Sequence, residues 1–180
     1  MRILREECAG VIIDVQEKLV PVINNSDEVV AKIKQLVEGL EILEIPLVVT
    51  QQYTKGLGET IDTIKKEFYN FNHLEKISFS CADEKAVMQK IKDIHKKDII
   101  VAGIEAHVCV LQTVIDLKQR GFNPIVVVDA VGSRKELDKK IALERMAFEG
   151  VSLTTVESIL FEICRFAGNK KFKEISSLVK

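Results

Sequence analysis

The chain lacks an excess of charge of either sign, and it lacks the glycine- and proline-rich stretches that mark linkers. Its 26 lysines and arginines stand against 27 aspartates and glutamates, which leaves a formal net charge of −1. Nucleic acids and anionic membranes attract proteins through a surplus of basic residues. The composition therefore favours a small-molecule partner, and we expect neither a nucleic acid nor a membrane as partner.

The chain also has few cysteines, and none is paired in a motif. The four cysteines form no C-x-x-C pair and no zinc-finger spacing: Cys8, Cys81, Cys109 and Cys164. This argues against a disulfide framework and against a structural metal. The start, "MRILREECAG", has no signal-peptide apolar region, and no apolar run approaches the ~20 residues that span a bilayer. We expect free thiols in a reducing, cytoplasmic protein.

What the chain does contain is alternating apolar and helical segments. A length of 180 residues with 47% hydrophobic residues predicts a single domain over 1–180. Six apolar runs are predicted strands: 9–14, 46–51, 73–77, 98–103, 124–129 and 151–155. Strands that alternate with helices predict a three-layer α/β/α sandwich, Rossmann-like, with an approximately six-stranded and mostly parallel sheet.

Helical periodicity fills the segments between these runs. The predicted helices cover 29–43, 87–94, 110–117, 136–149, 156–167 and 170–178. Asn25 and Ser26 are the expected N-terminal caps of the first, while Gly121 and Gly168 are expected to end the third and the fifth.

Three reactive side chains fall at or near the carboxyl ends of predicted strands, where ligands bind in parallel sheets. They are Asp14, Lys76 and Cys109. A thiol needs a base or a positive field to become a nucleophile. Asp14 could supply the base, and Lys76 could orient the carboxylate and favour anionic sulfur. Backbone N–H groups in the 104–109 turn could stabilise an oxyanion.

Each of these residues also has a purely structural interpretation. Cysteine is among the most buried residue types, so Cys109 alone is as consistent with packing as with chemistry. Asp14 fits a turn at a strand end, and Lys76 fits a solvated sheet edge. Only convergence at one edge of the sheet favours catalysis.

Four segments carry a family resemblance. "GVIIDVQEKL", "EKISFSC", "VAGIEAHVCVLQT" and "VVVDAVGSR" resemble, in order and spacing, the isochorismatase-like cysteine hydrolase superfamily. The resemblance covers about residues 8–167 and is closest to the compact branch of isochorismatase-domain-containing proteins. The G-x-x-x-x-x-C-V motif that begins at Gly103 is its most specific part.

The resemblance implies a cysteine hydrolase that acts on a small amide, ureide or carbamoyl compound through a thioester. By motif, Asp14 is the base, Lys76 the electrostatic support and Cys109 the nucleophile. It further implies a cis peptide bond between Ile104 and Glu105, and an oxyanion hole made by the backbone N–H groups of Glu105 and Cys109. Homo-oligomerisation is also expected from the family alone.

The chain departs from the nicotinamidases of this superfamily, which carry metal-binding histidines after the second strand. This segment reads "TQQYTKGLGETI", and the three histidines, His73, His95 and His107, lie elsewhere. We predict no metal and no cofactor. Candidate substrate contacts flank the motifs: Gln16, Tyr53, Phe79 and His107. Asp129 and the "GSR" at 132–134 are expected to organise loops rather than to perform chemistry.

Two other functions compete with hydrolysis. One is a binding or scaffold protein that has kept the fold and lost turnover, against which the intact set of three reactive residues speaks. The other is a nucleotide-binding α/β protein. Its phosphate motifs are missing, since "KGLGET" at 55–60 matches neither glycine-rich pattern.

Overall fold

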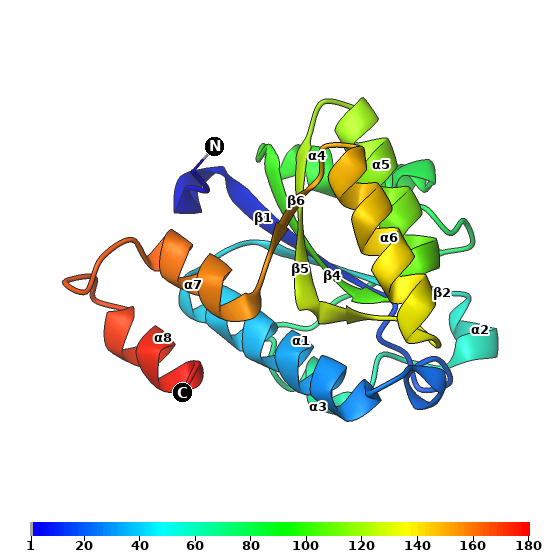
Figure 1. Ribbon diagram of the computed structural model, residues 1–180, viewed down its shortest axis with the longest axis horizontal. Helices are drawn as coiled ribbons and strands as arrows, with labels where there is room; N and C mark the ends of the chain where they lie inside the picture. Colours follow the sequence, from blue (N-terminus) through cyan, green and yellow to red (C-terminus); the bar gives the residue numbers. More distant parts are fainter. Residues whose placement is uncertain (1) are drawn as a thin grey trace.

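A single all-parallel sheet forms the centre of the molecule (Figure 1). The computed structural model describes residues 2–180. The strand order is β3-β2-β1-β4-β5-β6. The strands are β1 (Cys8–Ile13), β2 (Leu47–Gln52), β3 (Leu74–Lys76), β4 (Asp98–Ile104), β5 (Asn123–Gly132) and β6 (Ser152–Thr154). The predicted fold class is confirmed, and the sheet is parallel throughout.

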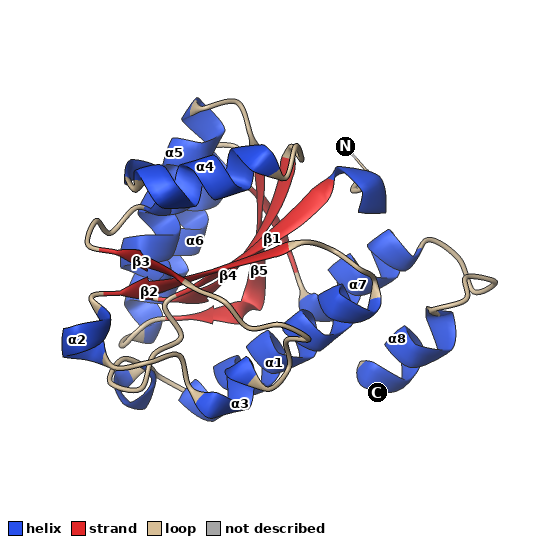
Figure 2. Ribbon diagram, turned by 180° about the vertical axis from the view of Figure 1, so that it is seen from behind, coloured by secondary structure: helices blue, strands red, loops and turns tan. Residues whose placement is uncertain are grey.

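Helices cover both faces of the sheet, as Figure 2 shows. One face carries α1 (Ser26–Ile42), α3 (Asp62–Lys65), α7 (Val156–Cys164) and α8 (Phe172–Leu178). The other carries α4 (Lys85–Asp93), α5 (Leu111–Gln119) and α6 (Glu136–Phe148). The short α2 (Thr54–Leu57) follows β2, and Ala106–Val110 form a π-helical turn that leads into α5. Each face has its own apolar core, and the sheet lies between the two.

The two central strands explain the continuous apolar runs in the sequence. Every residue of β1 and of β4 is buried, because helices cover both faces of a parallel sheet. These strands approach closely at their carboxyl ends. A Cβ atom on Gly103 would lie 2.1 Å from the carbonyl oxygen of Ile13, and the φ of Gly103 is +125°. Only glycine fits there, and this close approach brings the residues after β1 and β4 together.

The predicted elements are present, with boundaries that shift by a few residues. Two details of the helix predictions were wrong. Asn25 precedes α1 in a left-handed conformation and makes no side-chain capping bond. α7 ends at Cys164 rather than at 167, because the backbone of Arg165 turns to φ 78° and leaves the helix. Within residues 2–180, no helix combines the length and apolarity needed to cross a bilayer.

Candidate functional site

The sheet order brings three strand ends to one place. Asp14 directly follows β1, Lys76 is the last residue of β3, and Cys109 lies in the π-helical turn after β4. β2 lies between β3 and β1, and its last residues complete the same edge. The side chains predicted from separate motifs therefore meet at the carboxyl ends of neighbouring strands, as expected for parallel sheets.

Asp14 and Lys76 form a buried ion pair. The Nζ of Lys76 lies 2.7 Å from Oδ2 of Asp14, and neither side chain is exposed to solvent. The other carboxylate oxygen, Oδ1, accepts a hydrogen bond of 2.8 Å from the hydroxyl of Thr50. A buried charge is strongly unfavourable unless it is paired and hydrogen-bonded. Both conditions are met for Asp14.

Three oxygens besides the carboxylate surround the ammonium group of Lys76. Nζ donates to Oε1 of Gln52 at 2.5 Å, and to the carbonyl oxygens of Ser78 and Phe79 at 3.1 Å each. Gln52 in turn donates from Nε2 to the carbonyl of Ile77. These bonds hold the ammonium group in a fully buried position, so Lys76 does not lie on a solvated edge.

Cys109 completes the cluster. Its Sγ lies 3.6 Å from Nζ of Lys76, the same ammonium group that contacts the carboxylate of Asp14. Cys109 is 6% exposed. Burial, reinforced by the negative charge of Asp14, raises the pKa of the thiol to about 12. At neutral pH the resting site therefore holds a thiol, and formation of a thiolate requires a base in contact with the sulfur.

The carboxyl group of Asp14 has the properties of such a base. Burial raises the pKa of Asp14 above its ordinary value, and the attraction of Lys76 and the hydrogen bond from Thr50 oppose that rise. For Lys76, burial is the largest single effect and lowers the pKa, but the charge of Asp14, its hydrogen bond and the nearby thiols of Cys109 and Cys81 together outweigh it, and the net pKa is raised. Lys76 therefore stays protonated, and a carboxylate with a raised pKa takes up a proton more readily than an exposed one.

The turn that carries Cys109 is fastened by the loop after β5. The Ile104–Glu105 peptide bond is cis, as predicted. The carboxylate of Glu105 accepts two hydrogen bonds from Arg134, at 2.7 and 2.8 Å. Two residues further on, Nδ1 of His107 lies 3.0 Å from the hydroxyl of Ser133. The "GSR" loop thus holds the 104–109 turn at two points, in agreement with its predicted organising role.

Gln16 was predicted to contact substrate, and its position does not support that role. The side chain is fully buried. Nε2 donates to the carbonyl oxygens of Gln52 and Gly58 at 3.0 and 2.7 Å, and Oε1 accepts from the N–H of Gln52 at 2.7 Å. All its polar atoms are used to join the end of β2 to the loop before Thr60. Gln16 therefore has a positioning role.

The other three predicted contacts remain available for a ligand. Tyr53 and Phe79 are 50% and 55% exposed. The backbone N–H of Tyr53 donates to the carbonyl of Lys76, and the carbonyl of Phe79 accepts from the ammonium group of Lys76. His107 lies two residues before Cys109 and is partly exposed. These placements put all three beside the cluster, and substrate contact through them stays a prediction.

The sequence interpretation missed Thr50 and Gln52. Thr50 and Gln52 belong to "VVTQQ", where an apolar run turns polar at the end of a strand. That change of polarity was the available signal. Arg134 belongs to the "GSR" segment that was expected to organise loops, but its partner Glu105, 29 residues away in sequence, was not predicted.

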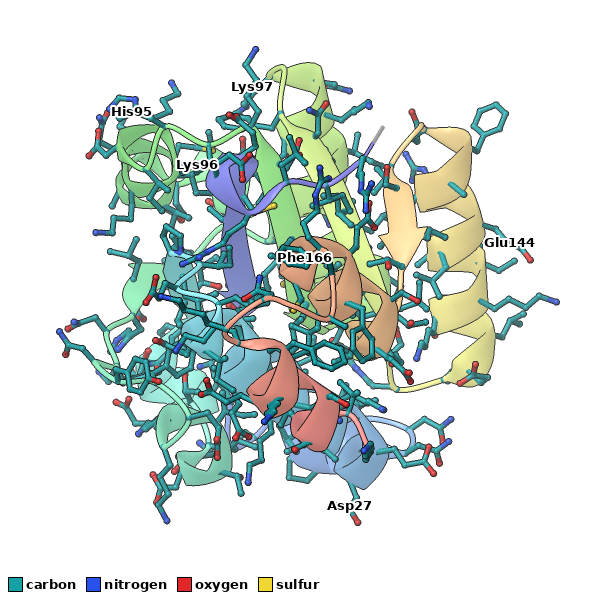
Figure 3. All side chains as sticks on the ribbon, turned by 90° about the vertical axis from the view of Figure 1, so that its left-hand side faces the viewer. Asp27, His95, Lys96, Lys97, Glu144 and Phe166 are labelled. Atoms are coloured by element: carbon teal, nitrogen blue, oxygen red, sulfur yellow. The ribbon has the colours of Figure 1, made fainter. Side chains whose placement is uncertain are left out.

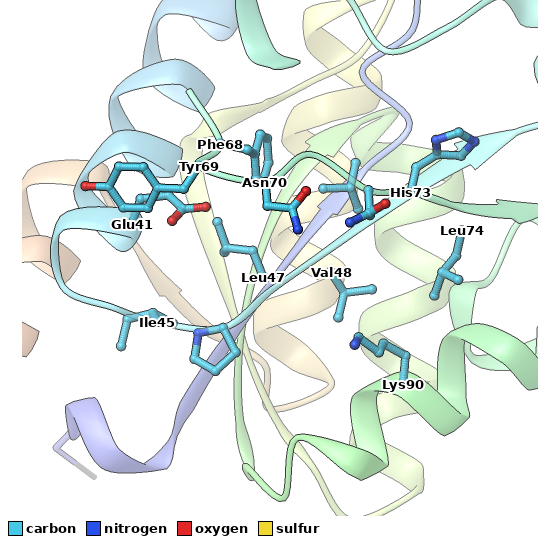
Figure 4. Close-up of a pocket in the computed structure, with 13 residues that line it drawn as sticks. Glu41, Ile45, Leu47, Val48, Phe68, Tyr69, Asn70, His73, Leu74 and Lys90 are labelled. Atoms are coloured by element: carbon cyan, nitrogen blue, oxygen red, sulfur yellow. The ribbon is translucent and has the colours of Figure 1, made fainter. Parts of the chain in front are cut away.

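A separate hollow of about 590 Å³ lies at the edge of β2, and it includes none of the clustered residues. β3 pairs only with Thr50–Gln52, so the outer edge of β2 is open before Thr50. Figure 4 shows Leu47 and Val48 on its floor, with Lys90 and Asn70 on either side. Within residues 2–180, no three His, Cys, Asp or Glu side chains are grouped so that they could hold a metal ion.

Comparisons with known proteins agree with the fold. Residues 8–158 match the family described as the isochorismatase domain. The chain is 38% identical to isochorismatase family protein 1B of Dictyostelium discoideum, over 99% of this chain and 89% of that protein. The solved structure of MAR1 ribonuclease from Caenorhabditis elegans has a TM-score of 0.93 and 37% identity, and the match covers 99% of this chain and 92% of that one.

A more distant structure shares the fold. The YcaC gene product of Escherichia coli, described as an octameric hydrolase of unknown specificity, has a TM-score of 0.93 at 22% identity. The match covers 99% of this chain and 89% of the YcaC chain.

Proposed function

The chain belongs to the isochorismatase domain family, and from that premise we propose that it is a cysteine-dependent hydrolase of a small amide, ureide or carbamoyl compound. The observation that carries the proposal is the buried contact of one ammonium group, Lys76 Nζ, with both the carboxylate of Asp14 and the sulfur of Cys109. A structural cysteine needs no such neighbours. A nucleophile with a high pKa does.

In the first half of the reaction, Sγ of Cys109 attacks the substrate carbonyl carbon while Asp14 accepts the thiol proton. A thiol with a pKa of about 12 is almost fully protonated at neutral pH, so proton removal must accompany attack. Asp14 lies close to the thiol in the resting site, because one ammonium group, that of Lys76, contacts both. Lys76 balances the negative charge that forms on the sulfur.

The carbonyl oxygen becomes an oxyanion as the tetrahedral intermediate forms. We assign its stabilisation to the backbone N–H groups of Glu105 and Cys109. Both belong to the turn that Arg134 and Ser133 fasten. Donors fixed before the reaction cost no reorganisation when charge develops, which is why such groups contribute strongly to catalysis.

Collapse of the intermediate breaks the C–N bond, and Asp14 returns its proton to the departing nitrogen. Ammonia or an amine leaves, and the acyl group stays on Cys109 as a thioester. Asp14, again a carboxylate, then takes a proton from a water molecule that attacks the thioester. The acid product leaves, and the proton on Asp14 returns to the sulfur of Cys109.

A retired binding protein is the alternative. Loss of turnover would remove the need for the contact between Asp14 and the thiol. Alkylation by iodoacetamide separates the two: a hydrolase reacts faster at Cys109 than at the other three buried cysteines, Cys8, Cys81 and Cys164. Equal reactivity at all four would favour the binding protein.

A ribonuclease is a second competing function, favoured by the name of the nematode relative. The candidate nucleophile, Cys109, is only 6% exposed, which suits a compact carbonyl compound better than a polyanionic chain. The net charge of −1 also lacks the basic surplus typical of nucleic-acid binding. RNA cleavage that the Cys109→Ala variant retains would place that activity elsewhere.

The broad test is a screen of amides, ureides and carbamoyl compounds for release of ammonia. We expect at least one compound to be hydrolysed by the native chain and not by the Cys109→Ala variant. Cys164→Ala is the matched control, because Cys164 is a buried free thiol on α7. Activity in Cys109→Ala equal to that in the control would reject the nucleophile.

We further propose a cytoplasmic homo-oligomer with no cofactor.

A further inference from the structure

Cys81 is a second buried thiol near the candidate site, and the proposed mechanism gives it no part. It begins the 3-10 turn Cys81–Asp83, and its side chain is free of disulfide bonds and fully buried. Its Sγ lies 3.8 Å from the hydroxyl oxygen of Thr50, within hydrogen-bonding reach of sulfur. A thiol that served packing alone would need no polar partner.

The two hydrogen bonds of Thr50 have a fixed order. A hydroxyl carries one proton, and Thr50 donates it to Oδ1 of Asp14 at 2.8 Å. The contact with Cys81 therefore runs the other way, with the thiol donating and the hydroxyl oxygen accepting. The result is a hydrogen-bond chain from Cys81 through Thr50 to Asp14. Each bond in such a chain polarises the next, which makes the last donor stronger than a hydroxyl alone.

This chain lies where solvent cannot replace it. Charged side chains usually project into water, as Lys97 and Glu144 do in Figure 3. Asp14 has no exposed surface, and neither Thr50 nor Cys81 has any. A buried carboxylate depends on the donors that the protein supplies. Loss of a donor from this chain is therefore not made good by water.

The backbone of Cys81 is fixed to the helix that follows the nucleophile. Its N–H donates to Oγ1 of Thr113 at 2.9 Å. Thr113 is a buried residue of α5, the helix that begins two residues after Cys109. Cys81 thus bonds to α5 through its backbone and to the donor of Asp14 through its side chain. It links the element behind the nucleophile to the base.

The thiol of Cys81 keeps its proton at neutral pH. Burial, reinforced by the negative charge of Asp14, raises the pKa of Cys81 to about 11, although the charge of Lys76 opposes the rise. A protonated thiol is the form that can donate to Thr50.

Titratable groups from four elements face the hydrogen-bond chain. They come from β3, the turn after β4, the residue before α4, and α5: Lys76, Cys109, Glu84 and Asp116. Glu84 and Asp116 each accept a hydrogen bond from a serine hydroxyl of the loop before the 3-10 turn. Lys76 contacts Oδ2 of Asp14, whereas the chain from Cys81 reaches Oδ1. The two oxygens of the base are therefore held from different sides.

We propose that Cys81 is a positioning residue of the candidate hydrolase: by donating to Thr50, it holds the Thr50 hydroxyl on Asp14 and keeps the base ionised. The inference rests on the proposed function in taking Asp14 as the base. The hydrogen-bond chain itself can be tested without a substrate.

The test is the titration of Asp14, followed by carboxyl-carbon NMR and assigned with Asp14→Asn. A hydrogen bond to the charged form of an acid lowers its pKa. Cys81→Ala removes the thiol donor, so the titration should move up by about half a pH unit. Cys81→Ser keeps a donor and should titrate as the native chain does. The acid limb of kcat/KM should move by the same amounts.

A second pair of variants repeats the comparison at the middle of the chain. Thr50→Val removes the direct donor and should move the titration up by about one pH unit. Thr50→Ser keeps the hydroxyl and should leave it in place. Far-UV circular dichroism checks that each variant is folded, and this pair carries the test if Cys81→Ala does not fold.

Cys8→Ala is the matched control. Cys8 is as buried as Cys81 and also donates a hydrogen bond, to the carbonyl oxygen of Leu4, but it begins β1 whereas Asp14 follows its end. This variant should titrate as the native chain does. A Cys81→Ala titration equal to that of the control, or a Cys81→Ser titration equal to that of Cys81→Ala, would overturn the role of the thiol.

The outcomes separate this inference from the proposed function. Hydrolysis that requires Cys109, in a chain whose Asp14 titrates alike with and without the Cys81 thiol, would reject the positioning role and leave the hydrolase standing. A titration that moves as expected, in a chain that hydrolyses no compound of the screen, would support the hydrogen-bond chain and count against the hydrolase.

Discussion

Lys76 and Asp14 form an ion pair of 2.7 Å in which neither side chain is exposed. The two partners are not equally dependent on each other. Lys76 keeps three uncharged oxygen acceptors when the carboxylate is removed, from Gln52, Ser78 and Phe79. Asp14 keeps only the hydroxyl of Thr50 as a side-chain hydrogen-bond donor when the ammonium is removed. The pair is therefore asymmetric.

This asymmetry predicts a difference in stability between two variants. Lys76→Met leaves a buried carboxylate without its counter-charge and should lower the free energy of unfolding by about 3–5 kcal/mol. Asp14→Asn should cost less, because the ammonium group retains its oxygen shell. Denaturant unfolding of both variants measures the difference. A larger loss in Asp14→Asn would show that the shell around Lys76 has been misjudged.

The double variant Lys76→Met/Asp14→Asn provides the coupling energy. It should be more stable than the sum of the single losses predicts, since no uncompensated charge remains. Additive losses would mean that the two side chains do not interact in solution.

The pH dependence of activity should reflect Asp14 rather than Cys109. The base must be deprotonated, and burial raises its pKa above the ordinary value of 3.8. As the pH falls through this raised pKa, kcat/KM should therefore fall, and it should do so at a higher pH than an exposed aspartate would give. The thiol, with a pKa of about 12, should produce no rise in activity between neutral and mildly alkaline pH.

The rate of iodoacetamide alkylation at Cys109 gives the same titration without a substrate. In the native chain the alkylation rate should fall at low pH over the same range as kcat/KM. In the Asp14→Asn variant this fall should be absent. An alkylation rate that instead increases tenfold per pH unit across neutrality in the native chain would mean that bulk hydroxide, and not Asp14, removes the proton.

Arg134 is predicted to act as a positioning residue. Arg134→Ala releases the carboxylate of Glu105 and should lower kcat by about 10–100-fold with little change in KM, because a misplaced turn affects the transition state. Unfolding free energy should change by less than about 1 kcal/mol, since the arginine side chain is 59% exposed. Arg134→Lys should recover part of kcat.

Arg145→Ala is the matched control for Arg134. Arg145 is similarly exposed, at 58%, and its ion pair with Glu149 lies away from the turn. Equal losses of kcat in the two alanine variants would remove the special role of Arg134.

The sequence predicted the part of the site that comes from strand ends, and the physical reason is direct. Asp14 and Cys109 come after strong apolar runs, Lys76 lies in the family motif "EKISFSC", and parallel strands bring such positions to one edge. The same logic predicted the sheet class and its six strands. Boundaries moved where local backbone geometry decided the end, as at Arg165 after α7.

The rest of the site required side-chain geometry. Gln16 was predicted to contact substrate because it flanks a motif, yet its side-chain amide donates to the backbone carbonyl oxygens of Gln52 and Gly58. Gln52 fell just outside the predicted strand 46–51 and was given no role, yet it accepts a hydrogen bond from the ammonium group of Lys76. Which polar group satisfies which buried partner depends on distances of tenths of an ångström, and no sequence pattern records these.

The most direct measurement is the intact mass of the protein, quenched in acid during turnover of the best compound from the hydrolysis screen. The proposed mechanism predicts an added acyl mass that maps to the peptide containing Cys109, present in the native chain and absent from Cys109→Ala. Turnover of that compound by Cys109→Ala at the native rate, with no adduct on Cys109 in the native chain, would contradict the central claim.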